Sequence, residues 1–308
     1  MNMNTFSNHQ ELAVIIPTKN EEIHISRAIK SALRITKYVI VVDSSSTDKT
    51  VEIAVSLGAI VLQYEWTRSS NFSKKMNWAF DNLPINADWI IRLDADEYFD
   101  ESTISLLRIK LSEIAPGVNA VALRRRVHFL GKWIRYGGQY PITNIRIIRS
   151  GFAVYELQWL DEVVKVDGNK IVYLPLDFID DSLISLSEWV NKHNRYSNQN
   201  AIEKLNLELG FIARTSSTFI GKQSLKSQRR KVFYTKLPIF WRSGFYFFLR
   251  YFIWLGFLDG VQGFLWHFLQ GWWYQTLTDA KVLEIKKACG NDPEKIKAYI
   301  STKYHIDL

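Results

Sequence analysis

The first hundred residues alternate short apolar runs with stretches of helical periodicity, and few folds accept this order. Four apolar runs have the length of buried strands: residues 12–16, 38–42, 60–64 and 89–93. Between them lie three stretches with the apolar spacing of one helix face: residues 23–33, 48–57 and 72–83. Strands joined by crossover helices of this kind form a parallel sheet. The sequence therefore predicts an α/β fold for this part of the chain.

Polar segments follow three of these strands, at the places where open α/β sheets bind their ligands. They are residues 17–22, 43–48 and 94–96. Asp94 and Asp96 are expected to point to the same side, because side chains alternate along a strand. Paired carboxylates suit Mg²⁺ or Mn²⁺, which could hold a diphosphate. The alternatives are a chance Asp-x-Asp in an exposed loop and, for Asp43, a turn cap.

Absent motifs and the cysteine count argue against several classes of protein. The chain has neither a Gly-x-Gly-x-x-Gly fingerprint nor a Gly-x-x-x-x-Gly-Lys loop, which argues against dinucleotide dehydrogenases and P-loop phosphate hydrolases. The single cysteine, Cys289, excludes an internal disulfide and a structural zinc cluster, and it fits a reducing compartment. Residues 1–11 lack the basic and apolar blocks of a signal peptide, so we expect a cytoplasmic protein.

From residue 118 the pattern changes to longer alternating segments, which predict an extension of the sheet in mixed orientation. Two of them, residues 121–129 and 142–148, have the length of long strands. Asp167 and Gly168 form a turn signal between residues 163–166 and 171–174, which predicts a hairpin. Just before this hairpin stand Trp159, Asp161 and Glu162. An acceptor could bind there, but an exposed acidic turn explains these residues equally well.

Five segments, in this order, resemble the inverting family 2 glycosyltransferases with the GT-A fold. They are residues 14–22 (VIIPTKNEE), 41–48 (VVDSSSTD), 71–77 (NFSKKMN), 92–97 (RLDADE) and 192–197 (KHNRYS). Within that family the chain is similar to small bacterial enzymes of lipopolysaccharide-core and O-antigen assembly. The resemblance covers about residues 12–197. It implies a Rossmann-like mixed sheet flanked by helices as a nucleotide-sugar domain over residues 1–197. Residues 198–308 are expected to form a C-terminal helical, membrane-associating region.

The resemblance also implies roles for individual residues. Donor-contacting positions would be Pro17, Thr18, Glu21, Asp43, Lys75, Asn77 and Asp94. Asp43 would accept a hydrogen bond from a uracil ring, so the donor would be a UDP-sugar. Asp96 would bind a Mg²⁺ or Mn²⁺ ion on the diphosphate. Glu162 would be the general base that deprotonates the acceptor hydroxyl, with Asp161 as its competitor, and one base suffices for a displacement with inversion.

The chain departs from the family pattern at two places. Many relatives have a histidine after the second strand of the hairpin, where residues 176–181 of this chain have none. Asp180 is a candidate replacement as metal ligand, or the metal is held by Asp96 and the nucleotide alone. Asp43 is followed by Ser44 and not by a second acid, which leaves open which nucleobase the donor carries. His193 lies on a predicted helix, where a lone histidine is more often a packing residue than a catalytic one.

The C-terminal part combines aromatic and basic residues. Residues 239–274 contain 16 aromatic side chains, and residues 222–250 contain eight basic residues and no acidic one, which equals the net charge of +8. Arg242, Arg250 and Asp259 divide the apolar sequence into runs that are short for a spanning helix. Helices lying in the interface of an anionic membrane are therefore favoured over spanning ones. The alternative is that these aromatic residues form a buried core. Binding of nucleic acid is disfavoured, because the aromatic residues adjoin Leu, Ile and Val.

Together these features predict a peripheral membrane enzyme on the cytoplasmic side of the bacterial inner membrane. It would be an inverting glycosyltransferase that moves a sugar from a UDP-sugar to a lipid-linked oligosaccharide or lipopolysaccharide acceptor, with a metal ion and a carboxylate base. Two alternatives remain open from the sequence. One is an enzyme that transfers sugar to polyprenyl phosphate, and the other is a non-catalytic scaffold recruited to membranes.

Overall fold

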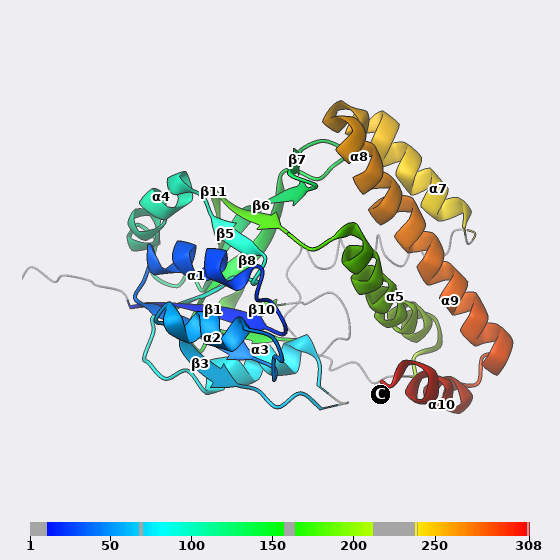
Figure 1. Cartoon of the computed structure of the whole chain (residues 1–308), viewed down its shortest axis with the longest axis horizontal. Helices are drawn as coiled ribbons and strands as arrows, with labels where there is room; N and C mark the ends of the chain where they lie inside the picture. Colours follow the sequence, from blue (N-terminus) through cyan, green and yellow to red (C-terminus); the bar gives the residue numbers. More distant parts are fainter. Residues whose placement is uncertain (1–10, 68–69, 157–163, 212–237, 239, 307) are drawn as a thin grey trace, which may run out of the picture.

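The computed structural model describes residues 11–67, 70–156, 164–211, 238, 240–306 and 308. The described chain forms two parts that lie side by side (Figure 1). One is a mixed β-sheet with helices packed against it, and the other is a group of long helices from the C-terminal third. This is the GT-A-like architecture, a mixed sheet flanked by helices with an aromatic-rich helical region, which the sequence predicts.

Four parallel strands form the first half of the main sheet, in the order β3-β2-β1-β4. They are β1 (Leu12–Thr18), β2 (Tyr38–Asp43), β3 (Ile60–Gln63) and β4 (Trp89–Arg92). The helices between them are α1 (Ile25–Leu33), α2 (Thr50–Ser56) and α3 (Phe72–Asp81). These elements confirm the seven predicted ones, with small shifts at their ends. Their polar C-terminal extensions therefore meet at one edge of the sheet.

Strand β1 explains why this half is covered on both faces. All seven of its residues are buried, and they alternate between two cores. Val14 and Ile16 pack with α1 and α2, while Ala13 and Ile15 pack with Met76 of α3. A strand with apolar residues on both faces needs a helix layer on each side, and the crossover helices supply both.

The second half of the sheet is mixed. Its elements are β5 (Glu97–Phe99), α4 (Glu101–Ser112), β6 (Ala120–Phe129), β7 (Lys132–Ile134), β8 (Ile142–Arg149) and β11 (Ile171–Asp181). The complete strand order is β3-β2-β1-β4-β8-β6-β11-β5, with β7 paired to β6. After β4 the chain passes to β5, which pairs antiparallel with β11 and sets Glu97 opposite Asp180. The Asp94–Asp96 turn thus lies close to the end of β11.

The predicted hairpin around Asp167 and Gly168 is wrong in its pairing. The turn itself exists as a short 3-10 segment, and Gly168 has a φ of 70°. However, β10 (Val164–Val166) pairs with β9 (Ala153–Tyr155) in a separate two-stranded sheet, while β11 joins β6 and β5. The reason is long-range packing, because Phe178 of β11 is buried in the main core and Tyr155 of β9 in the core beside α3.

The helical part consists of helices that pack on one another and on the sheet part. They are α5 (Leu186–Leu209), α7 (Trp241–Phe248), α8 (Gly260–Trp266), α9 (Tyr274–Cys289) and α10 (Pro293–Tyr304). Shorter π-helical and 3-10 turns link them: Leu249–Ile253, Gly256–Asp259 and His267–Trp273. Figure 1 shows α5 and α9 alongside each other.

Helix α5 connects the two parts. It begins at a capping box in which Ser185 and Glu188 bond each other's backbone N–H groups. Near its start Trp189 packs with Phe129 of β6, and farther along Leu205 packs with Ile285 of α9. The division that the sequence suggests after residue 197 falls inside this continuous helix.

The charged residues of the segment from α7 to α8 point inward. Arg242 pairs with Asp279 of α9, and the Nε of Arg250 donates to the carbonyl oxygen of Gly137 at 3.3 Å. The carboxylate of Asp259 accepts the backbone N–H groups of residues 135 and 136 at 3.0 and 2.8 Å. The three side chains therefore leave the apolar surface uninterrupted, although they interrupt the apolar sequence.

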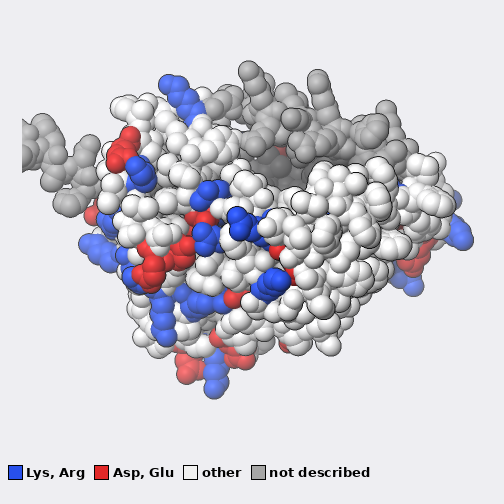
Figure 2. All heavy atoms as spheres, turned by 90° about the horizontal axis from the view of Figure 1, so that it is seen from above, with Lys and Arg blue, Asp and Glu red and all other residues white. Residues whose placement is uncertain are grey.

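The outer surface of this segment is apolar and exposed. Its exposed side chains are Phe240, Trp241, Phe245, Phe248, Phe252, Ile253, Trp254, Leu255, Phe257, Leu258, Val261 and Phe264. Figure 2, seen from above, shows a broad uncharged area on this side of the molecule. No single helix of the described chain is long and apolar enough to cross a bilayer. The pair Trp241–Ile253 and Gly256–Cys289, bent by 72°, meets those requirements only together.

Candidate active site

A cavity of about 1740 Å³ lies where the parallel strands end, between the sheet part and α5. Of the residues predicted to bind the donor or the metal, six line it: Pro17, Thr18, Glu21, Lys75, Asp94 and Asp96. They come from the ends of β1 and β4 and from α3, so the fold brings together residues up to 79 positions apart in the chain. Asp180 and Lys192 line the same cavity from β11 and α5.

The loops that follow β1 and β2 are joined by hydrogen bonds. The backbone N–H of Asn20 donates to Oγ of Ser46 at 2.8 Å, and the N–H of Thr47 donates to Oδ1 of Asn20 at 2.8 Å. Below them, Oγ1 of Thr18 donates to Oδ1 of Asp43 at 3.0 Å. Asp43 is fully buried and lies behind the cavity wall, which Ser44 and Ser45 form at this place. Its predicted contact with a uracil ring stays a prediction.

Two residues of α3 lie differently with respect to the cavity. Lys75 lines it, and its buried Nζ donates to the carbonyl oxygen of Thr18 at 2.9 Å. Burial lowers the pKa of Lys75 to about 8, although Asp43 and Asp94 counteract this. Asn77 is occupied elsewhere, because its side-chain amide exchanges two hydrogen bonds of 2.9 and 2.8 Å with the backbone of Tyr155. It therefore holds β9 against α3, and its donor contact stays a prediction.

Asp94 is fixed by two arginines. Nε and Nη2 of Arg92 donate to its two oxygens at 2.9 and 2.8 Å, and Arg146 approaches Oδ2 at 3.5 Å. Burial alone would raise the pKa of Asp94, but the two guanidinium groups outweigh it and hold this pKa below its usual range. Arg146 also pairs with the buried Glu97, whose Oε2 accepts the N–H of Asp94 at 3.0 Å. The first carboxylate of the turn is therefore a rigid anion.

The negative charges of Asp96 and Asp180 are balanced less fully by neighbouring cations than that of Asp94. Burial raises the pKa of Asp96, Lys192 opposes this in part, and the neighbouring Asp94 adds to the rise. Burial and the nearby Asp96 raise the pKa of Asp180 to about 6, with Arg125 at 3.7 Å as a partial counterion. Excess negative charge of this kind favours binding of a cation.

The donor atoms here are carboxylate oxygens, which fit the hard ions Mg²⁺ and Mn²⁺. In the described part of the chain, no three acidic, histidine or cysteine side chains converge as a complete metal site. Asp96 could therefore bind a metal ion only if other ligands, such as diphosphate oxygens and water, complete the coordination. Asp180 lies on β11 where the missing family histidine is expected.

Glu21 is oriented by a histidine that the sequence reading missed. The N–H of Leu183 donates to Nε2 of His24 at 2.9 Å, which leaves the ring proton on Nδ1. This Nδ1 donates to Oε2 of Glu21 at 2.6 Å. Because His24 is almost completely buried, it links the loop after β1 to the entry of α5 and directs the Glu21 carboxylate along the cavity wall.

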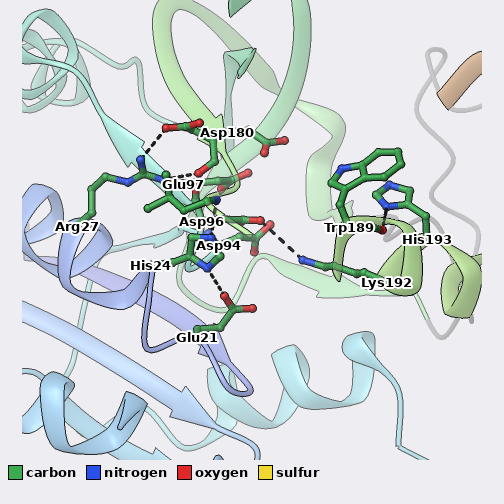
Figure 3. Close-up of polar contacts among 12 residues, drawn as sticks. Glu21, His24, Arg27, Asp94, Asp96, Glu97, Asp180, Trp189, Lys192 and His193 are labelled. Carbon is green, nitrogen blue, oxygen red and sulfur yellow. Dashed lines mark hydrogen bonds and ion pairs between the residues drawn. The ribbon is translucent and has the colours of Figure 1, made fainter. Parts of the chain in front are cut away.

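Helix α5 closes the opposite side of the cavity (Figure 3). Nζ of Lys192 lies 3.8 Å from Oδ2 of Asp96. The ring of His193 stacks on Trp189 with a centroid distance of 3.5 Å, and its Nε2 lies 2.7 Å from the side-chain amide nitrogen of Gln270. Burial lowers the pKa of His193 to about 4, so the ring is neutral at neutral pH. His193 therefore packs on Trp189, as predicted for a lone histidine on this helix, and it also lines the cavity.

The two candidate bases, Asp161 and Glu162, lie outside the described residues. The described chain resumes at Val164, which lines the cavity. Sequence reading also gave no role to Arg146 or Lys192. A signal existed for Arg146, since a charge among the isoleucines of β8 requires a buried partner. Lys192 begins the fifth segment of the family resemblance, but only the fold brings it to Asp96.

Two solved structures are similar to this chain at low sequence identity. Residues 1–349 of S. aureus TarS give a TM-score of 0.43 at 16% identity, covering 96% of this chain and 92% of that chain. Glucosyl-3-phosphoglycerate synthase from Mycobacterium tuberculosis, in complex with Mn²⁺, UDP and glucosyl-3-phosphoglycerate, gives a TM-score of 0.42 at 14% identity. That match covers 63% of this chain and 80% of the synthase.

Sequence relatives match part of the chain. An uncharacterized glycosyltransferase of Rickettsia typhi is 43% identical over 88 residues, which span 29% of this chain and 28% of the relative. One of Mycoplasma genitalium is 29% identical over 107 residues, which span 32% of this chain and 36% of the relative. Residues 13–158 match the family described as Glycosyl transferase family 2. This match covers just under half of the chain, so residues 13–158 are similar to that family, and the chain spans less than two fifths of the length of either of these relatives.

Proposed function

We propose that the protein is an inverting glycosyltransferase that moves a sugar from a UDP-sugar to a lipid-linked oligosaccharide or lipopolysaccharide acceptor. The observation that carries this proposal is the Asp94–Asp96 turn in the cavity at the strand ends. Its first carboxylate is fixed by Arg92 and Arg146, while its second faces the cavity with excess negative charge around it. One rigid anion beside one that can bind a cation is an arrangement suited to a nucleotide diphosphate and its metal ion.

In this proposal different residues bind the donor and assist the displacement. Asp96, with Asp180 beside it, would hold Mg²⁺ or Mn²⁺, and a bound ion would neutralise the charge that grows on the leaving diphosphate. Thr18, Glu21 and Lys75 line the wall against which the nucleotide would lie. Asp94 would contact the ribose or the sugar. Its rigid position orients the donor without a change in the protein during the reaction.

Glu162 is proposed as the general base, with Asp161 as the competitor. In support, the described chain on one side of them, at Val164, lines the cavity. We expect Glu162→Gln to bind the donor as the wild type does and to lose about 100-fold in transfer rate, because a positioned base contributes about 10²- to 10⁴-fold. Calorimetric titration with UDP and a transfer assay measure the two effects. A loss confined to Asp161→Asn would move the base to Asp161.

The apolar surface of the α7–α8 segment supports peripheral attachment to a membrane, proposed here as the cytoplasmic side of the bacterial inner membrane. All charged residues within residues 240–266 are buried, whereas bulky apolar ones are exposed. Residues 222–236, just before α7, contain six basic residues and no acidic one, which suits anionic lipid. Trp266 at the end of α8 and Arg250 also line the cavity, so a headgroup at this surface would lie near its mouth.

Membrane attachment predicts a measurable effect of two exposed residues. Ile253 and Val261 are 58% and 71% exposed, so serine at both positions should leave the fold unchanged. We expect the double variant to bind vesicles of anionic phospholipid at least about tenfold more weakly, since each side chain loses apolar area that the membrane would bury. Co-sedimentation measures the affinity. Serine at the exposed Val55 and Ile109 of the sheet part is the control, and equal binding by both double variants would contradict the assignment.

A donor screen tests the function itself. Purified protein, Mn²⁺ or Mg²⁺, a panel of nucleotide sugars and a bacterial lipid extract are combined, and release of nucleoside diphosphate is measured. We expect release from one UDP-sugar, abolished by a chelator and in Asp96→Ala. Product analysis separates a glycan acceptor from polyprenyl phosphate. If no donor is bound or consumed, the enzymatic proposal fails and the membrane-recruitment scaffold replaces it.

A further inference from the structure

Lys192 is the cation that reaches the acidic end of the cavity from α5. It lies two turns into this helix, whose first turn is fixed by the capping box of Ser185 and Glu188 directly after β11. Figure 3 shows it pointing from α5 across the cavity toward the Asp94–Asp96 turn. Its side chain is 29% exposed, and that of Asp96 is 20% exposed. Both groups are therefore accessible to a ligand that enters the cavity.

The contact between Lys192 and Asp96 is a loose one. At 3.8 Å it is an ion pair without a hydrogen bond, in contrast to the 2.8–2.9 Å bonds that fix Asp94 to Arg92. A lysine ammonium group ordinarily carries its positive charge at neutral pH. It is held by the general field of the acids and not by one partner, so it can change partners at little cost.

Several other cations on the cavity wall are held more closely. Lys75 is 4% exposed, and its Nζ is bonded to the carbonyl oxygen of Thr18. Arg92 and Arg146 are committed to Asp94 and Glu97. Arg125 also lines the cavity with a loose contact, but it faces Asp180 at 3.7 Å. Lys192 combines a charge, partial exposure and a loose contact with Asp96 itself.

We propose that Lys192 is the protein's own cation for the donor diphosphate. This inference rests on the proposed function and adds a residue to it. Without donor, the ammonium group pairs with Asp96. When a nucleoside diphosphate enters, it moves to an oxygen of the β-phosphate, and the carboxylate of Asp96 becomes available to a divalent ion. Lys192 and the divalent ion would therefore compete for Asp96 when no donor is bound, whereas both would bind the diphosphate when the donor is present.

The same position would serve the displacement step. The bond between the anomeric carbon and the β-phosphate oxygen breaks, and its electron pair stays on the diphosphate. The acceptor oxygen forms the new bond and gives its proton to the general base. Negative charge therefore grows on the β-phosphate, where a nearby ammonium group stabilises it more in the transition state than in the bound donor. No other co-reactant is needed.

Binding measurements with Lys192→Met test the inference, because its two predicted effects have opposite signs. Mn²⁺ alone should bind Lys192→Met about three- to tenfold more tightly, since a competing cation has been removed from Asp96. UDP should bind about tenfold more weakly in the presence of saturating Mn²⁺, because one charged contact to the diphosphate is lost. Titration calorimetry measures both. Lys192→Arg, which keeps the charge, should retain most of the affinity for UDP.

Arg195→Met is the matched control, since Arg195 is exposed on the same helix and its loss removes the same charge. It should change neither affinity appreciably. If Lys192→Met weakens both ligands, Lys192 has only a structural role, and if it alters neither, the residue does not face the diphosphate. Either result overturns the inference while the proposed function stands. If the wild type itself binds no UDP, the proposed function fails and takes the inference with it.

Discussion

Replacing Asp96 by alanine should lower the turnover number about 10³-fold in the presence of Mn²⁺ or Mg²⁺. The variant would lose the carboxylate that faces the cavity, and with it the position of the metal ion that neutralises the leaving diphosphate. Preorganised charge stabilisation of this kind is worth several kcal/mol, or about 10²- to 10³-fold for a single group. Release of nucleoside diphosphate from the donor, followed over time at saturating substrate, measures the loss.

The fold should survive this change. In the described part of the chain the Asp96 side chain makes an ion pair with Lys192, whereas its contacts to Arg27 and Asp181 use only its backbone carbonyl oxygen. Removing the carboxylate also relieves its repulsion with Asp180. Asp81→Ala, at an exposed position of α3, is the control for loss of one acidic charge. An Asp96→Ala protein that turns over normally would refute the metal assignment.

Replacing Asp279 by alanine should lower the free energy of unfolding by about 3–5 kcal/mol, the usual cost of removing one partner from a buried ion pair. Asp279 is fully buried. Its carboxylate holds Arg242 of α7, with a bond of 2.9 Å from Nε, and Lys204 of α5 at 3.0 Å. Alanine would leave both cations buried without this counterion. Because natural domains are stable by about 5–15 kcal/mol, the loss would be a large fraction of the total.

Urea unfolding followed by tryptophan fluorescence measures this effect. Lys287→Ala, exposed on the same helix α9, is the control and should change the free energy of unfolding little. If Asp279→Ala does not fold, Asp279→Asn retains the side-chain size and allows a measurement. A cost below about 1 kcal/mol would show that the three groups are not coupled, since that is the range of exposed pairs.

The same site predicts a pH dependence. Burial alone would raise the pKa of Asp279, but Arg242 and Lys204 outweigh it and lower this pKa. A carboxylate with a lowered pKa in the folded state stabilises the protein fully above its unfolded-state pKa of about 4. The contribution disappears as the pH falls through the folded-state pKa. The stability difference between wild type and Asp279→Ala should therefore be constant near neutral pH and shrink in acid.

Local patterns in the sequence determined most of the first half of the fold. The apolar periods of β1 to β4 and of α1 to α3 depend on neighbours along the chain, so they are readable without the structure. Clustering of the polar strand ends follows from parallel pairing alone, because the carboxyl ends of such strands meet at one edge. This is why Thr18 and Asp96, far apart in the chain, were expected at one site and line one cavity, whereas Lys75 on α3 was expected there only from the family resemblance.

Only the tertiary structure decided what depends on pairing across long distances. The turn at Gly168 could be predicted from the sequence, but long-range packing decided that β10 pairs with β9 and that β11 pairs with β6 and β5. The direction of Arg242, Arg250 and Asp259 depended on partners more than a helix away, and these partners turned three sequence interruptions into one continuous apolar surface. Lys192 reached Asp96 for the same reason. The apolar periodicity of a segment determines whether it forms a helix or a strand. The free-energy cost of burying a charge without a counterion determines which other segments it contacts.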